Sequence, residues 1–259
     1  MHSKQSKWLW GAASLVYLFL YLPLIIVVVY SFNDSKLNAE WVGFTFKWYE
    51  ILFNDAQMLT AARNTLIIGL VTSVCATVLG TLAGLAMYKY KLRLLPVLVL
   101  TPIAIPEILM GVSLLIFFVM LNMTLGLVSI ALSHIAFCIG FVAIVVRSRL
   151  QGMDESLVEA ARDLGATPVQ AFRLVTLPLI MPGIIAGALM AFTLSIDDFV
   201  ITFFTAGAGA STLPLQIYSM IRIAVTPEVN AISTLLMLLT LALIVIASKV
   251  APGAIKAQS

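Results

Sequence analysis

Charged side chains are scarce in this sequence. Asp, Glu, Lys and Arg make up 10% of its 259 residues, whereas soluble globular domains carry about 25%. Hydrophobic residues make up 61%, and the mean hydropathy is +1.08. These values exclude an ordinary soluble domain. The formal net charge is +3, and the basic residues flank apolar runs rather than form a patch, so no nucleic-acid partner is expected.

Cysteine is nearly absent as well. The chain has two, Cys75 and Cys138, whose spacing fits neither a zinc site nor a CxxC redox motif. Both lie inside apolar runs, which favours buried free thiols over a disulfide framework. We expect no metal site and no cofactor.

The sequence also lacks the motifs of common nucleotide-binding and hydrolytic enzymes. It contains no Gly-Lys dipeptide, so it has no Walker A loop to hold nucleotide phosphates. Neither HExxH nor GxSxG occurs, and no catalytic residue is predicted. The chain is therefore not expected to be an enzyme. If it moves a solute uphill with ATP, a separate subunit must hydrolyse that ATP.

Long apolar runs are what this chain has in abundance. A hydrocarbon core about 30 Å thick needs roughly 20 apolar residues in a helix. Six runs qualify, at about residues 8–31, 64–88, 95–121, 124–147, 183–205 and 229–250. They predict an all-α polytopic membrane protein with six transmembrane helices in a single domain, 1–259. The first run is too long for a signal peptide and lacks a small-residue cleavage site, which favours a retained anchor.

Lysine and arginine indicate the direction of the spans. With the N-terminus inside, only Lys36, Lys47, Arg63 and Arg222 of the 15 basic residues fall outside, an asymmetry typical of cytoplasmic loops rich in positive charge. Both termini and residues 148–182 are therefore expected in the cytoplasm, and residues 32–63 and 206–228 outside. In that outer region, the aromatic residues suit a belt at the membrane interface; they are Trp41, Trp48 and Tyr49.

Residues 154–182 are charged and amphipathic, although they lie between two apolar runs. Ser156 and Glu159 have the spacing of a capping box, and Asp154 adds negative charge at the helix start. Apolar residues then recur on one helical face; they are Leu157, Ala160, Ala161 and Leu164. An exposed apolar face of this kind between two spans is expected to hold a soluble partner.

The second half of this segment predicts a second helix. Gly165 fits a left-handed helix end, and Thr167-Pro168 fits the N-cap and first turn of the next helix. Pro178 and Pro182 are expected to end that helix.

The same segment resembles the EAA loop of bacterial ABC importer permeases. It contains Glu159-Ala160-Ala161, then Gly165, then Leu177-Pro178. In that family the loop docks into a groove on the cytoplasmic ATPase. The ATPase-coupling residues that the resemblance implies are Glu159, Ala160, Ala161, Asp163, Leu164, Gly165 and Pro178.

Four more strings resemble the spermidine/putrescine-type permeases: Tyr30-Ser-Phe-Asn33, Leu132-Ser-His134-Ile-Ala-Phe-Cys138, Ser195-Ile-Asp-Asp198 and Thr226-Pro-Glu-Val-Asn230-Ala-Ile. The resemblance implies a type I ABC importer (MetI-like) permease fold, with a cytoplasmic coupling loop at 148–182. It implies a permease subunit of an ATP-driven importer that moves polyamines (putrescine or spermidine) across the bacterial inner membrane. The implied partners are a second permease subunit, a dimer of a cytoplasmic ABC ATPase, a periplasmic polyamine-binding protein and the lipid bilayer.

Three alternatives remain open at this point. A permease of the same type could carry another small solute. A secondary cation-coupled carrier could use acidic residues in its spans, but the chain shows no inverted repeat and such a carrier has no use for residues 154–182. An intramembrane aspartyl hydrolase would need two catalytic acids on facing helices, and this chain shares with it only the spacing of acids.

Acidic residues inside the predicted spans are candidates for the solute pathway, because an ionisable group there costs about 2.5–3.5 kcal/mol on insertion scales. Glu107 lies in the third apolar run, and Asp197 and Asp198 lie at a similar depth in the fifth. With no Lys or Arg in these spans, the three carboxylates suit a cationic solute such as a polyamine.

The two adjacent aspartates are expected to differ in role. Neighbouring helix positions point about 100° apart, so Asp197 and Asp198 cannot both face the pathway squarely. One of them is expected to cap a helix break or to pair with Arg222. The pathway candidates are thus Glu107, Asp198 and Asp197, whereas His134 is expected to be a core histidine with its hydrogen bonds satisfied.

Overall fold

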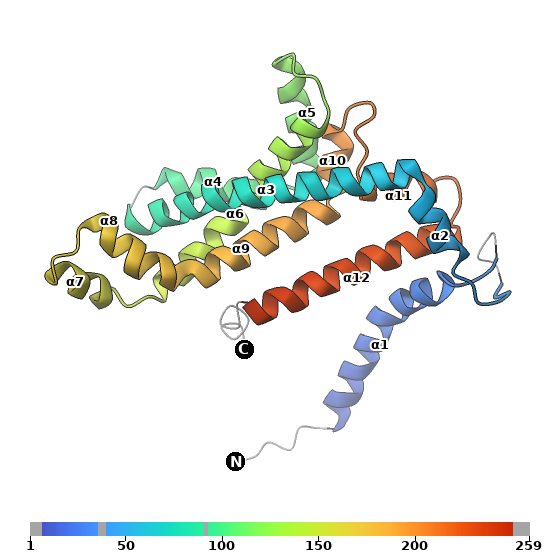
Figure 1. The fold of residues 1–259 in the computed structure, drawn as a ribbon, viewed down its shortest axis with the longest axis horizontal. Coiled ribbons are helices and arrows are strands. Elements are labelled where there is room, and N and C mark those ends of the chain that lie inside the picture. The colour runs from blue at the N-terminus through green and yellow to red at the C-terminus, as the bar shows by residue number, and fades with distance from the viewer. Residues whose placement is uncertain (1–6, 36–39, 91–92, 251–259) are drawn as a thin grey trace. The chain divides into compact units, whose positions relative to one another are not determined.

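The computed structural model describes residues 7–35, 40–90 and 93–250, which are almost wholly helical (Figure 1). The chain divides into two compact units, Met1–Leu59 with Gln216–Leu239, and Thr60–Leu215 with Thr240–Ser259. Within the described ranges, extended backbone pairs only at the isolated bridge between Asn33 and Phe44. The predicted all-α fold class is confirmed.

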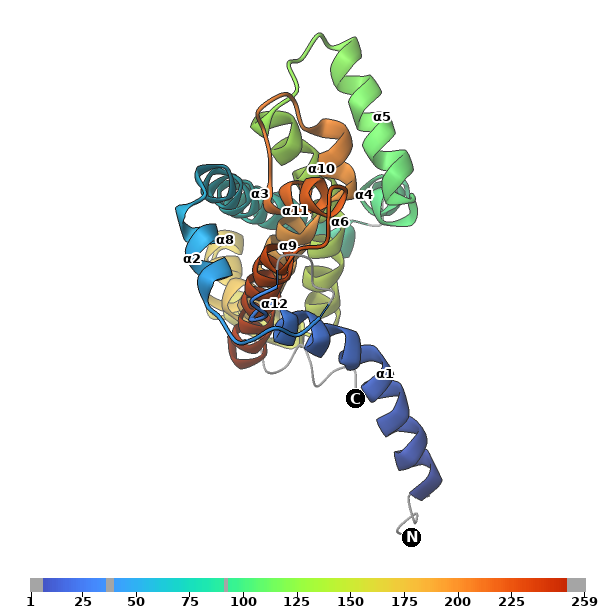
Figure 2. The same ribbon diagram turned by 90° about the vertical axis from the view of Figure 1, so that its right-hand side faces the viewer.

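The order of the helices can be followed by colour in Figures 1 and 2. Their bounds are α1 Lys7–Tyr30, α2 Lys47–Asn54, α3 Ala56–Lys89, α4 Leu94–Ala104, α5 Glu107–Met120, α6 Leu127–Gln151, α7 Ser156–Asp163, α8 Pro168–Ala171, the π-helical stretch η1 Phe172–Thr176, α9 Leu177–Asp197, α10 Val200–Thr205, α11 Leu213–Ile221 and α12 Pro227–Val250. Among the described residues, four stretches are long and apolar enough to cross a membrane: Trp8–Tyr30, Ala56–Lys89, Leu127–Gln151 and Pro168–Asp197.

The third predicted span, 95–121, is not one straight helix. Leu94–Ala104 and Glu107–Met120 together have the length of a span, but they are bent by 108°. The cause is Pro106, which has no N–H to continue the ladder and forces the preceding residue out of the helical region. Ile105 is accordingly extended, with φ −80° and ψ 132°.

The last two predicted spans also differ from the helices observed. The fifth, 183–205, begins much earlier, at Pro168, and breaks after Asp197, where Asp198 is extended with ψ 121°. The sixth, 229–250, lies within α12, whose described apolar stretch is Pro227–Leu243. The total of six spans remains a prediction.

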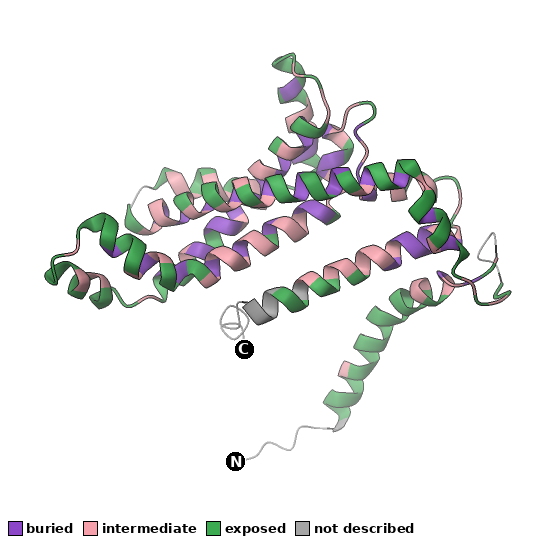
Figure 3. Cartoon of the chain, in the orientation of Figure 1, coloured by how far each residue is buried: buried purple, intermediate pink, exposed green. Residues whose placement is uncertain are grey.

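In the first unit, Asn33 organises the connection between α1 and α2. Its side-chain amide donates to the Glu40 carbonyl (2.8 Å) and its Oδ1 accepts from the Val42 N–H (2.9 Å). The Trp48 indole donates to the Asn33 carbonyl (2.8 Å). Trp48 is thus buried in protein rather than exposed like the side chains of an interfacial belt. The side chains of α1, in contrast, are exposed along nearly the whole helix (Figure 3).

In the second unit, α3, α6 and α9 pack closely because small residues line their contacts. A Cβ added at Gly80 of α3 would lie 2.6 Å from the Val142 side chain of α6, and one at Gly187 of α9 would lie 3.1 Å from it. Cys138, on the same face of α6, is a buried free thiol, and Cys75 is a half-buried free thiol. The predicted burial is confirmed for Cys138 but not for Cys75.

The break after α9 lets α10 pack along α5. Gly111 of α5 is close enough to Phe204 that an added Cβ would lie 2.7 Å from its ring. The turn that follows α5 contains Asn122 with a positive φ of 52°, a conformation that asparagine tolerates better than most residues. The chain therefore turns tightly between α5 and α6.

Residues 206–212, which connect α10 to α11, are pinned to α3 and to the start of α6. The Asn64 amide donates to the Ser211 carbonyl (2.9 Å), and the Leu213 N–H donates to the Thr65 hydroxyl (2.8 Å). A Cβ on Gly207 would lie 1.9 Å from the Leu125 carbonyl oxygen. No side chain fits there unless the backbone moves.

We therefore expect Gly207→Ala to lower the midpoint of thermal unfolding by about 2–10 °C, because overpacking typically costs about 1–3 kcal/mol. Gly126→Ala is the matched control, since a Cβ at Gly126 meets nothing within 4 Å. The measurement is thermal unfolding of the purified protein in detergent. Equal midpoints for the two variants would contradict the tight approach of Gly207 to Leu125.

Candidate functional site

The segment that follows α6 begins its first helix differently from the prediction. The capping box of Ser156 and Glu159 does not form; Ser156 is the first residue of α7, and the N-cap position is Glu155, which makes no side-chain cap. Instead the Asp154 carboxylate accepts a hydrogen bond from the Ser156 N–H (3.0 Å). Hydrogen bonds from the Ser156 hydroxyl and then its N–H hold the pKa of Asp154 below its usual value. The negative charge expected from Asp154 thus stabilises the helix start, but without the capping box.

The end of α7 is a Schellman motif built on Gly165. The Ala166 N–H donates to the Ala161 carbonyl (3.1 Å), and the Gly165 N–H donates to the Arg162 carbonyl (2.9 Å). Gly165 has φ +91°, a conformation that glycine adopts without steric cost. The predicted left-handed helix end at Gly165 is confirmed.

A complete capping box starts the next helix. The Gln170 N–H donates to the Thr167 hydroxyl (3.3 Å), and the Thr167 N–H donates to the Gln170 side-chain oxygen (2.8 Å). Pro168 occupies the first helical turn, as predicted. The contribution of Gln170 was missed, although its position three residues after Thr167 is the sequence signal of this motif.

The prolines do not end this helix, contrary to the prediction. The helical chain runs from Pro168 to Asp197, with Pro178 in the first turn of α9 and Pro182 inside it. Pro178 lacks the N–H that would bond to the carbonyl four residues earlier. The π-helical stretch Phe172–Thr176 comes directly before it, and the wider turn lets the helix continue past the missing donor.

Large apolar side chains on and next to α7 and α8 are exposed in this chain. Leu164 is 90% exposed, Val169 74% and Leu174 71%. Leu157, on the predicted apolar face of α7, is 47% exposed. Apolar side chains clustered in this way on a charged segment are typical of a protein–protein contact.

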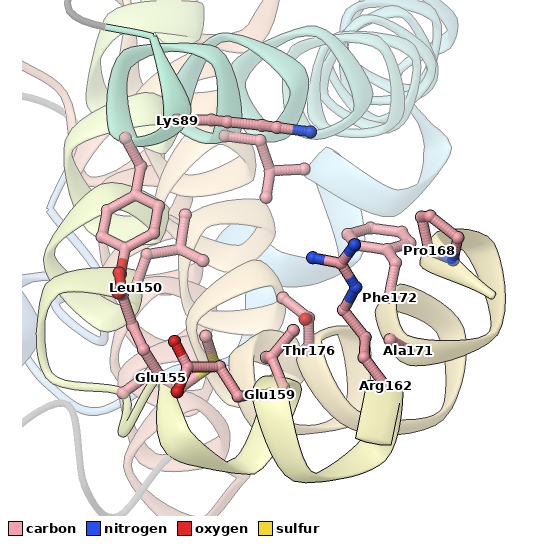
Figure 4. A pocket seen from close by; sticks show the side chains of 13 residues that line it. Lys89, Leu150, Glu155, Glu159, Arg162, Pro168, Ala171, Phe172 and Thr176 are labelled. Carbon is pink, nitrogen blue, oxygen red and sulfur yellow. The ribbon is translucent and has the colours of Figure 1, made fainter. Parts of the chain in front are cut away.

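A cavity of about 480 Å³ lies between this segment and the ends of α3 and α6 (Figure 4). Its wall includes Lys89 from α3, Leu150 from α6 and Phe172 from η1. The Tyr88 hydroxyl, at the end of α3, donates a hydrogen bond to the Glu155 carboxylate just before α7. Residues 154–182 are thus bonded directly to the end of α3, a contact that no sequence motif indicated.

The residues predicted to couple to an ATPase all lie on this segment. Glu159 lines the cavity and, with Asp163, a second hollow. The exposed members are Glu159, Ala160, Asp163, Leu164, Gly165 and Pro178, and Ala161 is half-buried.

A second candidate site lies at the break between α9 and α10. Asp198 follows the last residue of α9, and its Oδ1 accepts hydrogen bonds from the Thr202 N–H (2.8 Å) and hydroxyl (3.0 Å). The same oxygen lies 3.2 Å from His134 Nε2 on α6, and the two side chains are 7% and 2% exposed. Asp198 therefore caps the break, as expected for one of the two aspartates.

His134 has every ring nitrogen satisfied, which confirms that it is a core histidine. Its Nδ1 lies 2.7 Å from the Ser195 hydroxyl of α9, and its Nε2 lies 3.0 Å from the Thr202 hydroxyl of α10. The partners Ser195 and Thr202 could not be assigned from the sequence, because they become neighbours of His134 only through helix packing.

The other two acids at the breaks are exposed. Asp197 ends α9, and Glu107 lies in the first turn of α5, just after the proline bend. Asp197 interacts electrostatically with both Asp198 and Glu107. Because α10 packs along α5, two helix breaks that are distant in the sequence belong to the same part of the second unit.

Comparison with known proteins gives consistent relatives. The family model described as "Binding-protein-dependent transport system inner membrane component" matches residues 76–253. The spermidine/putrescine transport system permease protein PotC of Escherichia coli K12 is 41% identical over 244 residues, covering 93% of this chain and 92% of that protein. The putrescine transport system permease protein PotI of the same strain is 41% identical over 243 residues, covering 90% and 86%.

Solved structures show the same fold. The MetNI methionine ABC transporter, in an inward-facing conformation, superimposes with a TM-score of 0.66 at 21% identity, covering 82% of this chain and 99% of the other. A bacterial ABC transporter involved in the import of the acidic polysaccharide alginate gives a TM-score of 0.70 at 17% identity, covering 96% and 99%. The fold is that of a type I ABC importer permease.

Proposed function

Because this chain belongs to the binding-protein-dependent transport system inner membrane components, we propose that it is the permease subunit of an ATP-driven importer that moves polyamines across the bacterial inner membrane. The observation that carries the choice of solute is the pair of exposed carboxylates at the two helix breaks, Glu107 and Asp197, which interact electrostatically. The names of the relatives PotC and PotI, which refer to spermidine and putrescine, support the same choice.

A polyamine fits this acidic pair for an electrostatic reason. Two like charges that face each other in a medium of low dielectric constant repel strongly. An ammonium group placed between Glu107 and Asp197 would relieve that repulsion, and a second ammonium group on the same molecule would engage the next acceptor. The C-terminal ends of α4 and α9 add negative potential, because helix C-termini carry partial negative charge.

The segment 148–182 is proposed to couple transport to ATP hydrolysis. Its exposed leucines and Val169 would insert into a groove on a cytoplasmic ATPase, and the charged residues of α7 would surround that contact. The complex would hold a second permease subunit, two ATPase copies and an external polyamine-binding protein. Closure of the two ATPases would draw the coupling segments together and reorient the cavity.

The decisive experiment for the solute is ATP hydrolysis by the complex reconstituted in proteoliposomes. We expect the external binding protein loaded with putrescine or spermidine to stimulate hydrolysis, and the unloaded binding protein not to do so. Stimulation by a different class of solute, with no response to either polyamine, would assign the chain to another permease of the same type.

For coupling, we expect Gly165→Val to reduce stimulated ATP hydrolysis by about tenfold or more, because a β-branched residue at φ +91° costs about 1–3 kcal/mol. The variant should still insert and pair with the second permease. Gly152→Ala is the control, since its Cβ meets only ordinary contacts beyond 3.7 Å. Normal stimulation in Gly165→Val would refute the role of this helix end.

For the acidic pair, we expect Glu107→Gln and Asp197→Asn each to lower polyamine uptake, with loading of the external binding protein unchanged. Each amide removes one charge while it keeps the shape of the side chain. Ser113→Ala is the control on α5, because the Ser113 hydroxyl bonds only to the Leu109 carbonyl of its own helix. Uptake at the parent rate by both amide variants would mean that the path lies elsewhere.

For orientation, residues 148–182 and both termini are proposed to lie in the cytoplasm, and residues 206–228 outside. We expect Ser211→Cys, in a chain lacking Cys75 and Cys138, to react with an impermeant thiol reagent in intact spheroplasts. Thr167→Cys should react only in inverted vesicles. The opposite pattern of labelling would reverse the proposed topology.

A further inference from the structure

One buried side chain holds together the three parts of the α9–α10 break. His134 of α6 contacts Ser195 in the last turns of α9, Asp198 in the break itself and Thr202 in α10. A helix break leaves carbonyls at the end of one helix and N–H groups at the start of the next without intrahelical partners. The position of the short helix α10 therefore depends on side-chain contacts rather than on a continuous backbone ladder.

The hydrogen bonds in this cluster are mutually consistent. The Asp198 carboxylate has only acceptor atoms, so Thr202 donates to it from both its N–H and its hydroxyl. His134 Nε2 lies 3.2 Å from the same carboxylate oxygen. Because this oxygen can only accept, Nε2 must carry the hydrogen and donate it. His134 Nδ1 is left to bond with the Ser195 hydroxyl at 2.7 Å. A buried carboxylate is stable only when its oxygens are bonded in this way.

The same cluster determines where the neighbouring acid lies. Asp198 is drawn inward to α6, where its side chain is 7% exposed. Asp197 precedes it by one residue at the end of the α-helix, where successive side chains point about 100° apart. Asp197 is exposed and interacts with Glu107 instead.

We propose that His134 is a positioning residue that anchors Asp198 inward and thereby presents Asp197, together with Glu107, to the solute. This assignment of roles rests on the proposed transport function, but the geometry that it requires can be tested without any solute. The two adjacent aspartates then have different roles: Asp197 faces the passing cation, and Asp198 shapes the helix break.

The test measures thiol accessibility at position 197 in the assembled complex. Asp197→Cys is made in a chain without Cys75 and Cys138, and its rate of reaction with (2-trimethylammonioethyl) methanethiosulfonate is recorded. His134→Leu is then added; Leu fills the space but cannot bond to Asp198. We expect the labelling rate at position 197 to fall by about tenfold, because Asp198 loses a buried hydrogen bond to its charged group and no longer holds the break in place.

Two variants at or beside position 134 serve as controls. His134→Gln keeps an N–H donor near the Nε2 position and should restore the labelling rate to within about threefold of the parent. Ser133→Ala changes the adjacent buried residue, whose hydroxyl bonds only to the Ser129 carbonyl of its own helix, and should leave the rate unchanged. Ile196→Cys, at a position 3% exposed, should stay unreactive in the parent and so report any general loosening.

The proposal is overturned if Asp197→Cys is unreactive with His134 in place, or if His134→Leu and Ser133→Ala give equal labelling rates. If His134→Leu fails to assemble, His134→Phe, whose planar ring likewise cannot bond to Asp198, is used with the same criteria. The uptake assay is a separate arm: we expect His134→Leu to raise the KM for polyamine and His134→Gln to restore it. The labelling rate at position 197 could fall as expected while the parent complex transports no polyamine. That result would refute the proposed function and leave the positioning role of His134 intact.

Discussion

A backbone amide or carbonyl inside hydrocarbon has no water to bond, so each one must find a partner within the protein. This constraint governs the second unit. Continuous helices such as α6 meet it through their own ladders. The two breaks, at Ile105–Pro106 and at Asp198, violate it locally and need other groups to compensate. At the second break the compensation comes from Asp198, which bonds to the Thr202 N–H, and from the histidine behind it.

Residues 154–174 follow a different rule, because most of their side chains are exposed. Their helices are short, and each end is satisfied by a local device: Asp154 at the start of α7, Gly165 at its end and Thr167 with Gln170 at the start of α8. Helices of this length are marginal by themselves. Here the caps and the contact between Tyr88 and Glu155 fix their shape, so exposed apolar side chains can be presented without burial in this chain.

The parts of this structure that the sequence predicted are those that depend on local pattern. The apolar runs located most of the spanning helices, and Gly165 and Thr167-Pro168 marked helix ends that the structure contains. The predicted capping box of Ser156 and Glu159 does not form. The Asp154 carboxylate accepts the Ser156 N–H that the Glu159 side chain would otherwise bond. The sequence predicts that Pro178 and Pro182 end a helix. In the structure a π turn precedes Pro178, and Pro182 lies inside α9, so the helix continues past both.

What the sequence could not supply were contacts between distant segments. His134, Ser195 and Thr202 are ordinary residues in apolar runs, and only the packing of α6 on α9 and α10 makes them one cluster. The burial of Asp198 and the exposure of Asp197 likewise follow from that packing, since the two residues are chemically identical. Tyr88 gave no signal because its partner, Glu155, is 67 positions away.

The helical chain from Pro168 to Asp197 has a mechanical consequence. Its 30 residues correspond to a rod about 45 Å long at 1.5 Å per residue. The exposed apolar residues of the coupling segment lie at one end and the acidic break at the other. A tilt of about 5° at the coupling end would displace the far end by about 4 Å over that length. The π turn at Phe172–Thr176 and Pro178, which has no backbone donor, follow each other here, so we expect this rod to bend most easily at that point.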